Sequence, residues 1–123
     1  MNNVLIVGRL TTTPTLNYTE TNTKYTDITL AIIRAYKNIK TNCYDTDFIP
    51  VRIYHEMANT LIEYTRKGDL IGIKGRLETY TTTTTDDTQT QTQTTKHMIV
   101  VADKVTFLSA NTENTNNMDE GEI

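Results

Sequence analysis

The stretch DFIPVRIYH, residues 47–55, combines two kinds of side chain in strict alternation, and it decides the fold. Successive side chains of a β-strand point to opposite faces of the sheet. One face carries only β-branched residues suited to a core, namely Ile49, Val51 and Ile53. The other face is aromatic and cationic, and consists of Phe48, Pro50, Arg52 and Tyr54. Exposed rings around an arginine favour a partner with flat rings and negative charge, as in single-stranded nucleic acid. On this strand alone, packing of the rings beneath a loop is an equal alternative.

Composition predicts one domain followed by a tail. The 123 residues are 37% hydrophobic, with a formal net charge of −3. Residues 1–109 hold all twelve Lys and Arg against eleven acids, which gives +1, whereas residues 110–123 hold four acids and no base, which gives −4. A nearly neutral body can still present a basic face, and an acidic end can act separately. We therefore expect a binding domain over residues 1–109 and a flexible acidic tail over 110–123.

Cysteine content and hydropathy narrow the class further. Cys43 is the only cysteine, so no intramolecular disulfide and no cysteine-based zinc site is expected. The first ten residues, MNNVLIVGRL, lack a basic region before their apolar run, which argues against a signal peptide. No apolar run approaches the length of a membrane span. These features predict a cytoplasmic protein without cofactor, metal or membrane association.

Five strands are expected, at residues 4–7, 25–36, 47–55, 70–80 and 96–108. Polar residues 11–23 read as a loop, anchored to the body by Leu16 and Tyr18. In the second strand the alternation fails at Ile33, which indicates either burial on both faces, as in a subunit contact, or a bend. In the third strand Pro50 cannot donate to a ladder, and this predicts a bulge or an unpaired edge.

Between the third and fourth strands the hydrophobic period changes to that of a helix. Apolar residues recur at spacings of three and four across residues 56–67. Arg66 and Lys67 then match the cationic last turn of a helix, and Gly68 matches its glycine cap. The sequence predicts a short amphipathic helix over residues 56–67.

The fourth strand has a second outward row of bases and one ring, formed by Lys74, Arg76, Glu78 and Tyr80. Its Gly72 and Gly75 suit a bend or a close approach of backbones. Residues 81–95 are almost only Thr, Gln and Asp, yet Thr favours strands and residues 88–94 alternate with period two. We expect a β-ribbon arm with its tip near Asp86; a floppy polar arm is the alternative.

Five strands, one helix after the third and three long connections predict an all-β fold: a five-stranded Greek-key barrel of the OB type. In that fold the ligand face lies on strands two and three, beside the 1–2 and 4–5 loops. The unusual outward rows occupy that region.

The order of motifs also resembles one known family, the bacterial-type single-stranded DNA-binding proteins. The matching segments run in order across residues 2–108: NNVLIVGRL, PTLNYT, DITLAI, DFIPVRIY, LIEYTRKGDLIGIKGRLET and VVADKVTFL. The resemblance implies an OB barrel, usually a homotetramer, that binds single strands without sequence readout and without catalysis, in DNA replication, recombination or repair. The short tail and the unusual arm fit a phage or mobile-element member.

The resemblance also points to stacking rings, because the family's aromatic positions hold Tyr36, Phe48 and Tyr54 here. A fourth family ring falls at Thr82, and Tyr80, two residues earlier, is the substitute that we consider. Besides Arg52, the residues suggest phosphate contacts, with solvated surface charge as the alternative for each. These candidates are Arg9, Arg34, Lys37, Lys67, Lys74 and Arg76.

The family's acidic tip, which other replication proteins recognise, ends in Pro-Phe, whereas this chain ends differently. The corresponding candidates for partner binding are Asp119, Glu120, Glu122 and Ile123. We interpret Tyr18, Tyr25 and Tyr64 as structural.

An enzyme is not expected. His55-Glu56 begins like a zinc protease motif, but Asn59 occupies the position of the second histidine. No glycine-rich phosphate loop precedes a helix. The second hypothesis is an OB-fold accessory module of the primosome or replisome that acts mainly through protein contacts.

Overall fold

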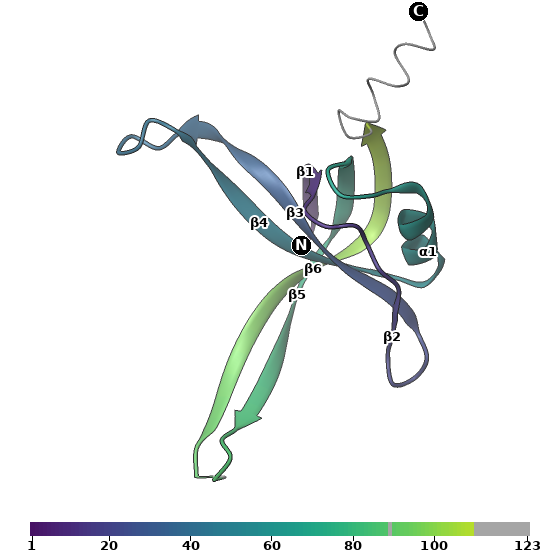
Figure 1. Ribbon diagram of the computed structural model, residues 1–123, viewed down its shortest axis with the longest axis vertical. Helices are drawn as coiled ribbons and strands as arrows, with labels where there is room; N and C mark the ends of the chain where they lie inside the picture. The colour runs from purple at the N-terminus through teal and green to yellow at the C-terminus, as the bar shows by residue number, and fades with distance from the viewer. Residues whose placement is uncertain (89, 110–123) are drawn as a thin grey trace, which may run out of the picture.

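A closed β-barrel forms the body of the molecule in the computed structural model, which describes residues 1–88 and 90–109 (Figure 1). The elements are β1 (Val4–Leu10), β2 (Asn17–Tyr18), β3 (Lys24–Lys37), β4 (Tyr44–Tyr54), α1 (His55–Tyr64), β5 (Leu70–Thr85) and β6 (Thr92–Ser109). The strand order is β1-β5-β6-β4-β3-β2, and an additional β1–β3 pairing closes the barrel. Five long strands with one helix between β4 and β5 are the predicted OB architecture.

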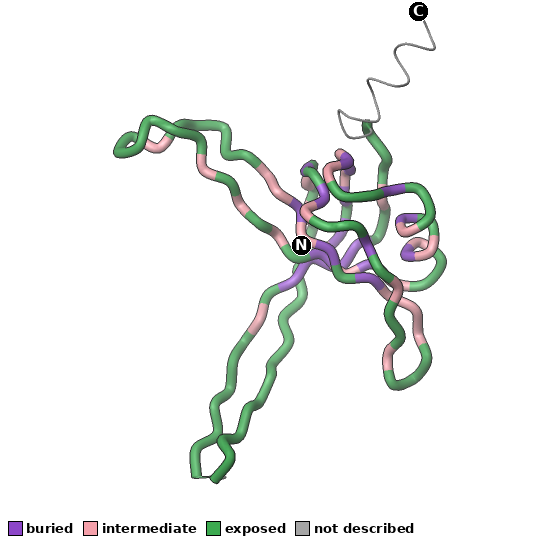
Figure 2. Tube along the Cα trace, viewed as in Figure 1, coloured by how far each residue is buried: buried purple, intermediate pink, exposed green. Residues whose placement is uncertain are grey.

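The core lies where the strands cross, as the buried segments in Figure 2 show. The side chains predicted to point inward from β4 and β5 meet there, and Val51, Ile53 and Ile71 are fully buried. Ala58 and Leu61 of α1 join the same cluster, so the helix covers one end of the barrel. The alternating pattern of residues 47–55 is thus confirmed: one face builds the core and the other remains outside.

The helix ends three residues earlier than predicted. Thr65 is extended and buried, and its hydroxyl donates to the Leu61 carbonyl at 2.6 Å. The Asp69 carboxylate then accepts from the backbone N–H of Arg66. These side-chain contacts with the backbone compete with continuation of the helix. Arg66 and Lys67 therefore lie in the following turn, and the expected cationic last turn of α1 was wrong.

Pro50 produces no bulge, because β4 pairs with β3 in unbroken register from Tyr54 to Thr46. The partner of Pro50 is Thr29, whose carbonyl accepts from the Thr11 N–H rather than from β4. The missing N–H of Pro50 is therefore not needed in this ladder. On its other side β4 meets β6 only at Val51 and Arg52, so Pro50 lies on the unpaired edge that was the second expectation.

Two further expectations concern β3 and the segment that precedes it, residues 11–23. The ladder shifts register between Ile33 and Lys37, in line with a bend, and Ile33 is exposed in the single chain, so a subunit contact at Ile33 stays a prediction. Residues 11–23 are not wholly a loop, because the short strand β2 pairs with β3. The ring of Tyr18 is exposed rather than anchored in the body.

The threonine-rich segment forms the predicted arm, defined here as residues 79–98 of the β5–β6 ribbon (Figure 1). Its ladder pairs Thr82 with Thr95 and continues to Thr85 and Thr92. At the tip the Asp86 carboxylate accepts from the N–H of Thr90 at 2.9 Å. Nearly all arm side chains are exposed, so cross-strand contacts between β-branched residues replace a core.

At the base of the arm β5 and β6 approach very closely. A Cβ added to Gly75 would lie 2.1 Å from the carbonyl oxygen of Val101. The β5–β6 register also shifts between Lys74 and Gly75. Glycine is thus needed here for the close approach of two backbones as the barrel closes, as expected for this strand.

Candidate nucleic-acid interface

The outward face of the β3–β4 ladder gathers several rings. Phe48, on β4, is 63% exposed. Tyr54 lies opposite Tyr25 of β3, with ring centroids 6.3 Å apart and tilted by 50°. The Tyr54 ring also approaches that of His55, at 6.0 Å. Tyr25, interpreted from the sequence as structural, therefore belongs to the same aromatic surface.

Arg52 lies between these tyrosines and is held in place. Its Nε and Nη2 donate to the two carboxylate oxygens of Asp27 at 2.7 and 2.9 Å. Its guanidinium carbon lies 4.6 Å from the Tyr25 ring centroid and 6.0 Å from that of Tyr54. The hydrogen bonds to Asp27 raise the pKa of Arg52 above its ordinary value, although partial burial opposes the rise.

Two more arginines predicted to contact phosphates also form ion pairs with carboxylates. The Nη2 of Arg34 donates a hydrogen bond to Oδ1 of Asp47 at 2.9 Å, and this contact lowers the pKa of the Asp47 carboxyl. Arg76 donates to Glu78 at 2.8 Å and to Asp103 at 2.7 Å. The positive charge of these arginines is locally balanced, so their attraction to a phosphate is weaker than the sequence suggests.

A second basic surface adjoins Phe48. One groove is lined by Arg9, Ala31, Ile33 and Phe48, among others. A second groove shares Arg9 and Ala31 with the first and adds Arg66 and Lys67. Two grooves with a common arginine connect an exposed ring to three basic residues. Of these, the sequence identified Arg9 and Lys67; Arg66 was assigned to the helix and missed.

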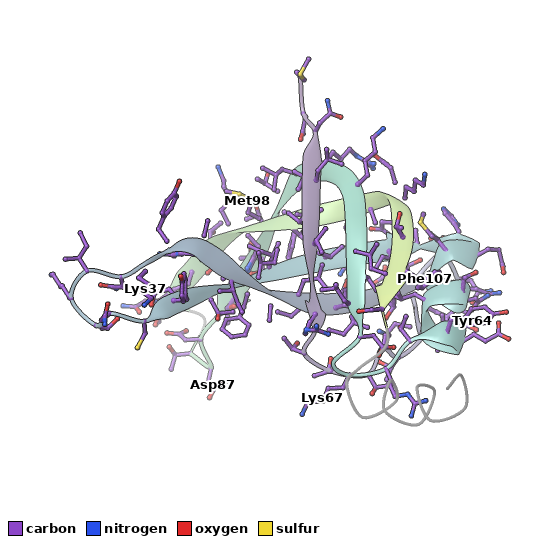
Figure 3. All side chains as sticks on the ribbon, turned by 90° about the horizontal axis from the view of Figure 1, so that it is seen from above. Lys37, Tyr64, Lys67, Asp87, Met98 and Phe107 are labelled. Carbon is purple, nitrogen blue, oxygen red and sulfur yellow. The ribbon has the colours of Figure 1, made fainter. Side chains whose placement is uncertain are left out.

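Other predicted cations lie elsewhere. Lys37 is far out on the β3–β4 ladder, 5.7 Å from the Tyr44 ring centroid, and well separated from Lys67 (Figure 3). Tyr36 is close to it in sequence and is 85% exposed. Lys74, on β5, is the cross-strand partner of Leu5 on β1, and it lines an apolar surface with Leu5. The role of Lys74 as a phosphate contact therefore stays a prediction.

The arm carries one aromatic pair. Tyr80 and His97 are cross-strand neighbours whose rings stack with centroids 4.7 Å apart and planes at 17°. His97 Nε2 also hydrogen-bonds the Thr82 hydroxyl at 2.9 Å. Thr82, where the resemblance implies a ring, therefore contacts a flat surface built by two other residues. The parity of Tyr80 suggested this position, but nothing in the sequence indicated its partner His97.

Some expectations concern residues outside the described ranges. The acidic tail and its four candidate partner-binding residues fall within 110–123, beyond the described residues. In the described ranges, 1–88 and 90–109, no group of three or more metal-ligating side chains occurs. No helix among those residues is long and apolar enough to span a membrane.

Comparison with known proteins identifies relatives along nearly the whole chain. The model of the "Single-strand binding protein family" matches residues 1–108. The "Single-stranded DNA-binding protein 3" of Clostridium acetobutylicum is 34% identical over 96% of this chain and 78% of its own length. The "Single-stranded DNA-binding protein" of Clostridium tetani is 37% identical over 88% of this chain and 70% of its own. That of Enterococcus faecalis is 40% identical over 64% of this chain, but the match spans only 42% of that relative.

A solved structure shares the fold. The chain in "Plasmodium falciparum SSB complex with ssDNA" superposes with a TM-score of 0.72, covering 89% of this chain and 96% of that one. Sequence identity is 20%. The barrel and its long ribbons are therefore an arrangement that also occurs in a solved protein.

Proposed function

This chain belongs to the single-strand binding protein family, and from that premise we propose that it binds single-stranded DNA without reading its sequence. The observation that carries the proposal is the exposed row of rings on the β3–β4 ladder beside a basic groove. Bases stack on aromatic faces whatever their identity, and cations along a groove follow the phosphates. Binding in this manner protects single strands during replication, recombination or repair and involves no catalysis.

In this proposal Phe48 and Tyr54 accept bases, with Tyr36 further along the ladder. Arg9, Arg66 and Lys67 face the phosphates through the two grooves that meet Phe48. Tyr80 offers a further ring on the arm. The support is the exposure of Phe48 together with the continuity of its groove with these cations.

We also propose that the protein acts as a homo-oligomer, a tetramer by the family resemblance. Leu5 and Val7 of β1 are 76% and 51% exposed, and with Gly72 and Leu108 they line an apolar surface. A second copy of this chain would remove that surface from water. Contacts of the acidic tail with other replication proteins, and a cytoplasmic location, complete the proposal.

Titration with oligo-dT tests the function. Stacking should quench tyrosine fluorescence, and a duplex of equal length should compete poorly. The binding constant should fall linearly on logarithmic axes with salt, with a slope of about 0.7 per phosphate neutralised. Absence of binding at low salt would refute the proposal. Light scattering of the same samples, with Leu5→Asp as the variant expected to dissociate, tests the assembly.

A further inference from the structure

Arg52 is the cation most firmly held on the aromatic face, and its surroundings suit a different role from that of a phosphate contact. We propose that Arg52 offers the flat face of its guanidinium to a stacked base, and that Asp27 and Tyr25 are the residues that position it. This inference rests on the proposed binding of single-stranded DNA and assigns chemistry to three neighbouring side chains.

The hydrogen-bonding edge of Arg52 is already used. Asp27 and Arg52 are cross-strand partners of β3 and β4, and two N–H groups of the guanidinium meet both carboxylate oxygens at 2.7 and 2.9 Å. This is the bidentate geometry with which arginine binds a phosphate. A phosphate at the same edge would have to displace Asp27 and would meet a pair with little net charge.

The planar face of Arg52 is used differently. The guanidinium lies 4.6 Å from the Tyr25 ring centroid, and the side chain of Arg52 remains 29% exposed. Arginine planes are weakly hydrated, and they stack on aromatic rings and on unpaired bases. With Tyr54 beside it, Arg52 extends a surface of planar groups, and Asp27 and Tyr25 limit its rotation.

A second clamp in the same ladder provides the comparison. Arg34 donates hydrogen bonds to Asp47 at 2.9 to 3.2 Å, and among the described residues no ring contact to Arg34 comparable to that of Tyr25 with Arg52 occurs. Both pairs combine one arginine with one aspartate on β3 and β4. Neutralising either pair therefore leaves the net charge of the ladder unchanged. The surroundings of the two pairs differ in the rings beside Arg52 and in a second carboxylate, Asp45, which lies 3.8 Å from Arg34.

The experiment compares the two charge-neutral double variants, Asp27→Asn/Arg52→Gln and Arg34→Gln/Asp47→Asn, with the wild type in oligo-dT titrations over a range of salt. We expect the first to weaken binding by about two- to tenfold, as for one exposed stacking contact. The second should lose less. The slope of the binding constant against salt should stay at the wild-type value in the first variant, because no phosphate contact is removed.

Two results would overturn the inference: equal affinity of the first variant and the wild type, or a salt slope that is shallower by about 0.7, which marks a lost phosphate contact. Tyr25→Leu with Tyr25→Phe as its rescue provides an independent test if the double variant melts early. Affinity should fall in Tyr25→Leu and return in Tyr25→Phe. Failure of the wild type itself to bind oligo-dT would instead refute the proposed function.

Discussion

The β3–β4 ladder and the arm are both antiparallel ladders that extend away from the barrel (Figure 1), but their side chains differ. The β3–β4 ladder carries rings on its outward face and holds two arginines, Arg34 and Arg52, by aspartates from the neighbouring strand. The arm pairs threonine with threonine and glutamine and has a single ring stack at its base. The length of the arm comes from β-propensity, whereas the β3–β4 ladder presents exposed rings and pairs its arginines with aspartates.

The difference shows how two ribbons of similar backbone can have different roles. A threonine ladder needs no core, because its hydroxyls remain hydrated and its branched side chains favour extended backbone. It contributes reach but few stacking or charged groups. We therefore assign binding chiefly to the β3–β4 ladder with the adjoining groove of Arg9, and the following variants test that division.

The largest expected effect is on stability, at the point where the barrel gives way to the arm. Gly75→Ala places a methyl group 2.1 Å from the Val101 carbonyl oxygen. The backbone must move to relieve this clash. We expect a loss of about 3 kcal/mol or more in the free energy of unfolding. Gly72→Ala is the control, because its nearest atom is an ordinary 3.7 Å away. Thermal melts of Gly75→Ala and Gly72→Ala measure the difference. Equal melting temperatures of the two variants would show that the close approach at Gly75 does not require glycine.

The next effect is on binding, on the β3–β4 ladder. Phe48→Ala and Tyr54→Ala should each weaken oligo-dT binding by about five- to 150-fold, equivalent to 1–3 kcal/mol for each stacked base. The melting temperature of Phe48→Ala should change little, since its ring is mostly exposed. If Phe48→Ala instead unfolds the protein while its folded fraction binds normally, the ring is a packing residue.

A smaller effect is expected at the base of the arm. Tyr80→Ala removes one half of the stack with His97 and should weaken oligo-dT binding by about fivefold, at the low end for one stacked base. His97→Ala leaves the Tyr80 ring and serves as the matched variant, with a smaller loss. Fluorescence titration measures both. A loss at Tyr80 that exceeds the loss at Phe48 would reverse the proposed division of roles.

The smallest effect should come from the outer arm. Residues 83–94 can be replaced by a two-residue Asn-Gly turn, because Thr82 and Thr95 are cross-strand partners that such a turn can join. We expect an unchanged melting temperature and an affinity for oligo-dT within about twofold of the wild type, since each arm contact is exposed and weak. A large loss of affinity would show that the arm's hydroxyls bind phosphates.

Much of the fold follows from periodicity. The alternation in residues 47–55 correctly separates the core side chains from the exposed ones, and the Thr-Gln alternation correctly predicts an arm with its turn at Asp86. Pro50 is different, because whether its missing N–H matters depends on the partner strand. The Thr29 carbonyl accepts from the Thr11 N–H. This contact depends on how the strands are arranged, so the sequence of β4 alone does not predict it.

The candidate site was less predictable for the same reason. Parity within β4 identifies Phe48, Arg52 and Tyr54, but cross-strand register decides that Tyr25 and Asp27 flank Arg52. Tyr25 and Asp27 both point outward from β3. Pairing β3 with β4 as a hairpin from the sequence alone would have placed them beside Arg52. The end of α1 was missed because its stop depends on side-chain hydrogen bonds of Thr65 and Asp69, not on helix propensity.

Bases stacked on the rings of the β3–β4 ladder should supply most of the affinity for single-stranded DNA. The most direct test compares oligo-dT with an abasic oligonucleotide of equal length and charge, titrated at one salt concentration. Stacking on at least two rings predicts that the abasic strand binds weaker by about a hundredfold or more. Equal affinity for the two strands would mean that phosphate contacts alone hold the DNA, and it would contradict the account.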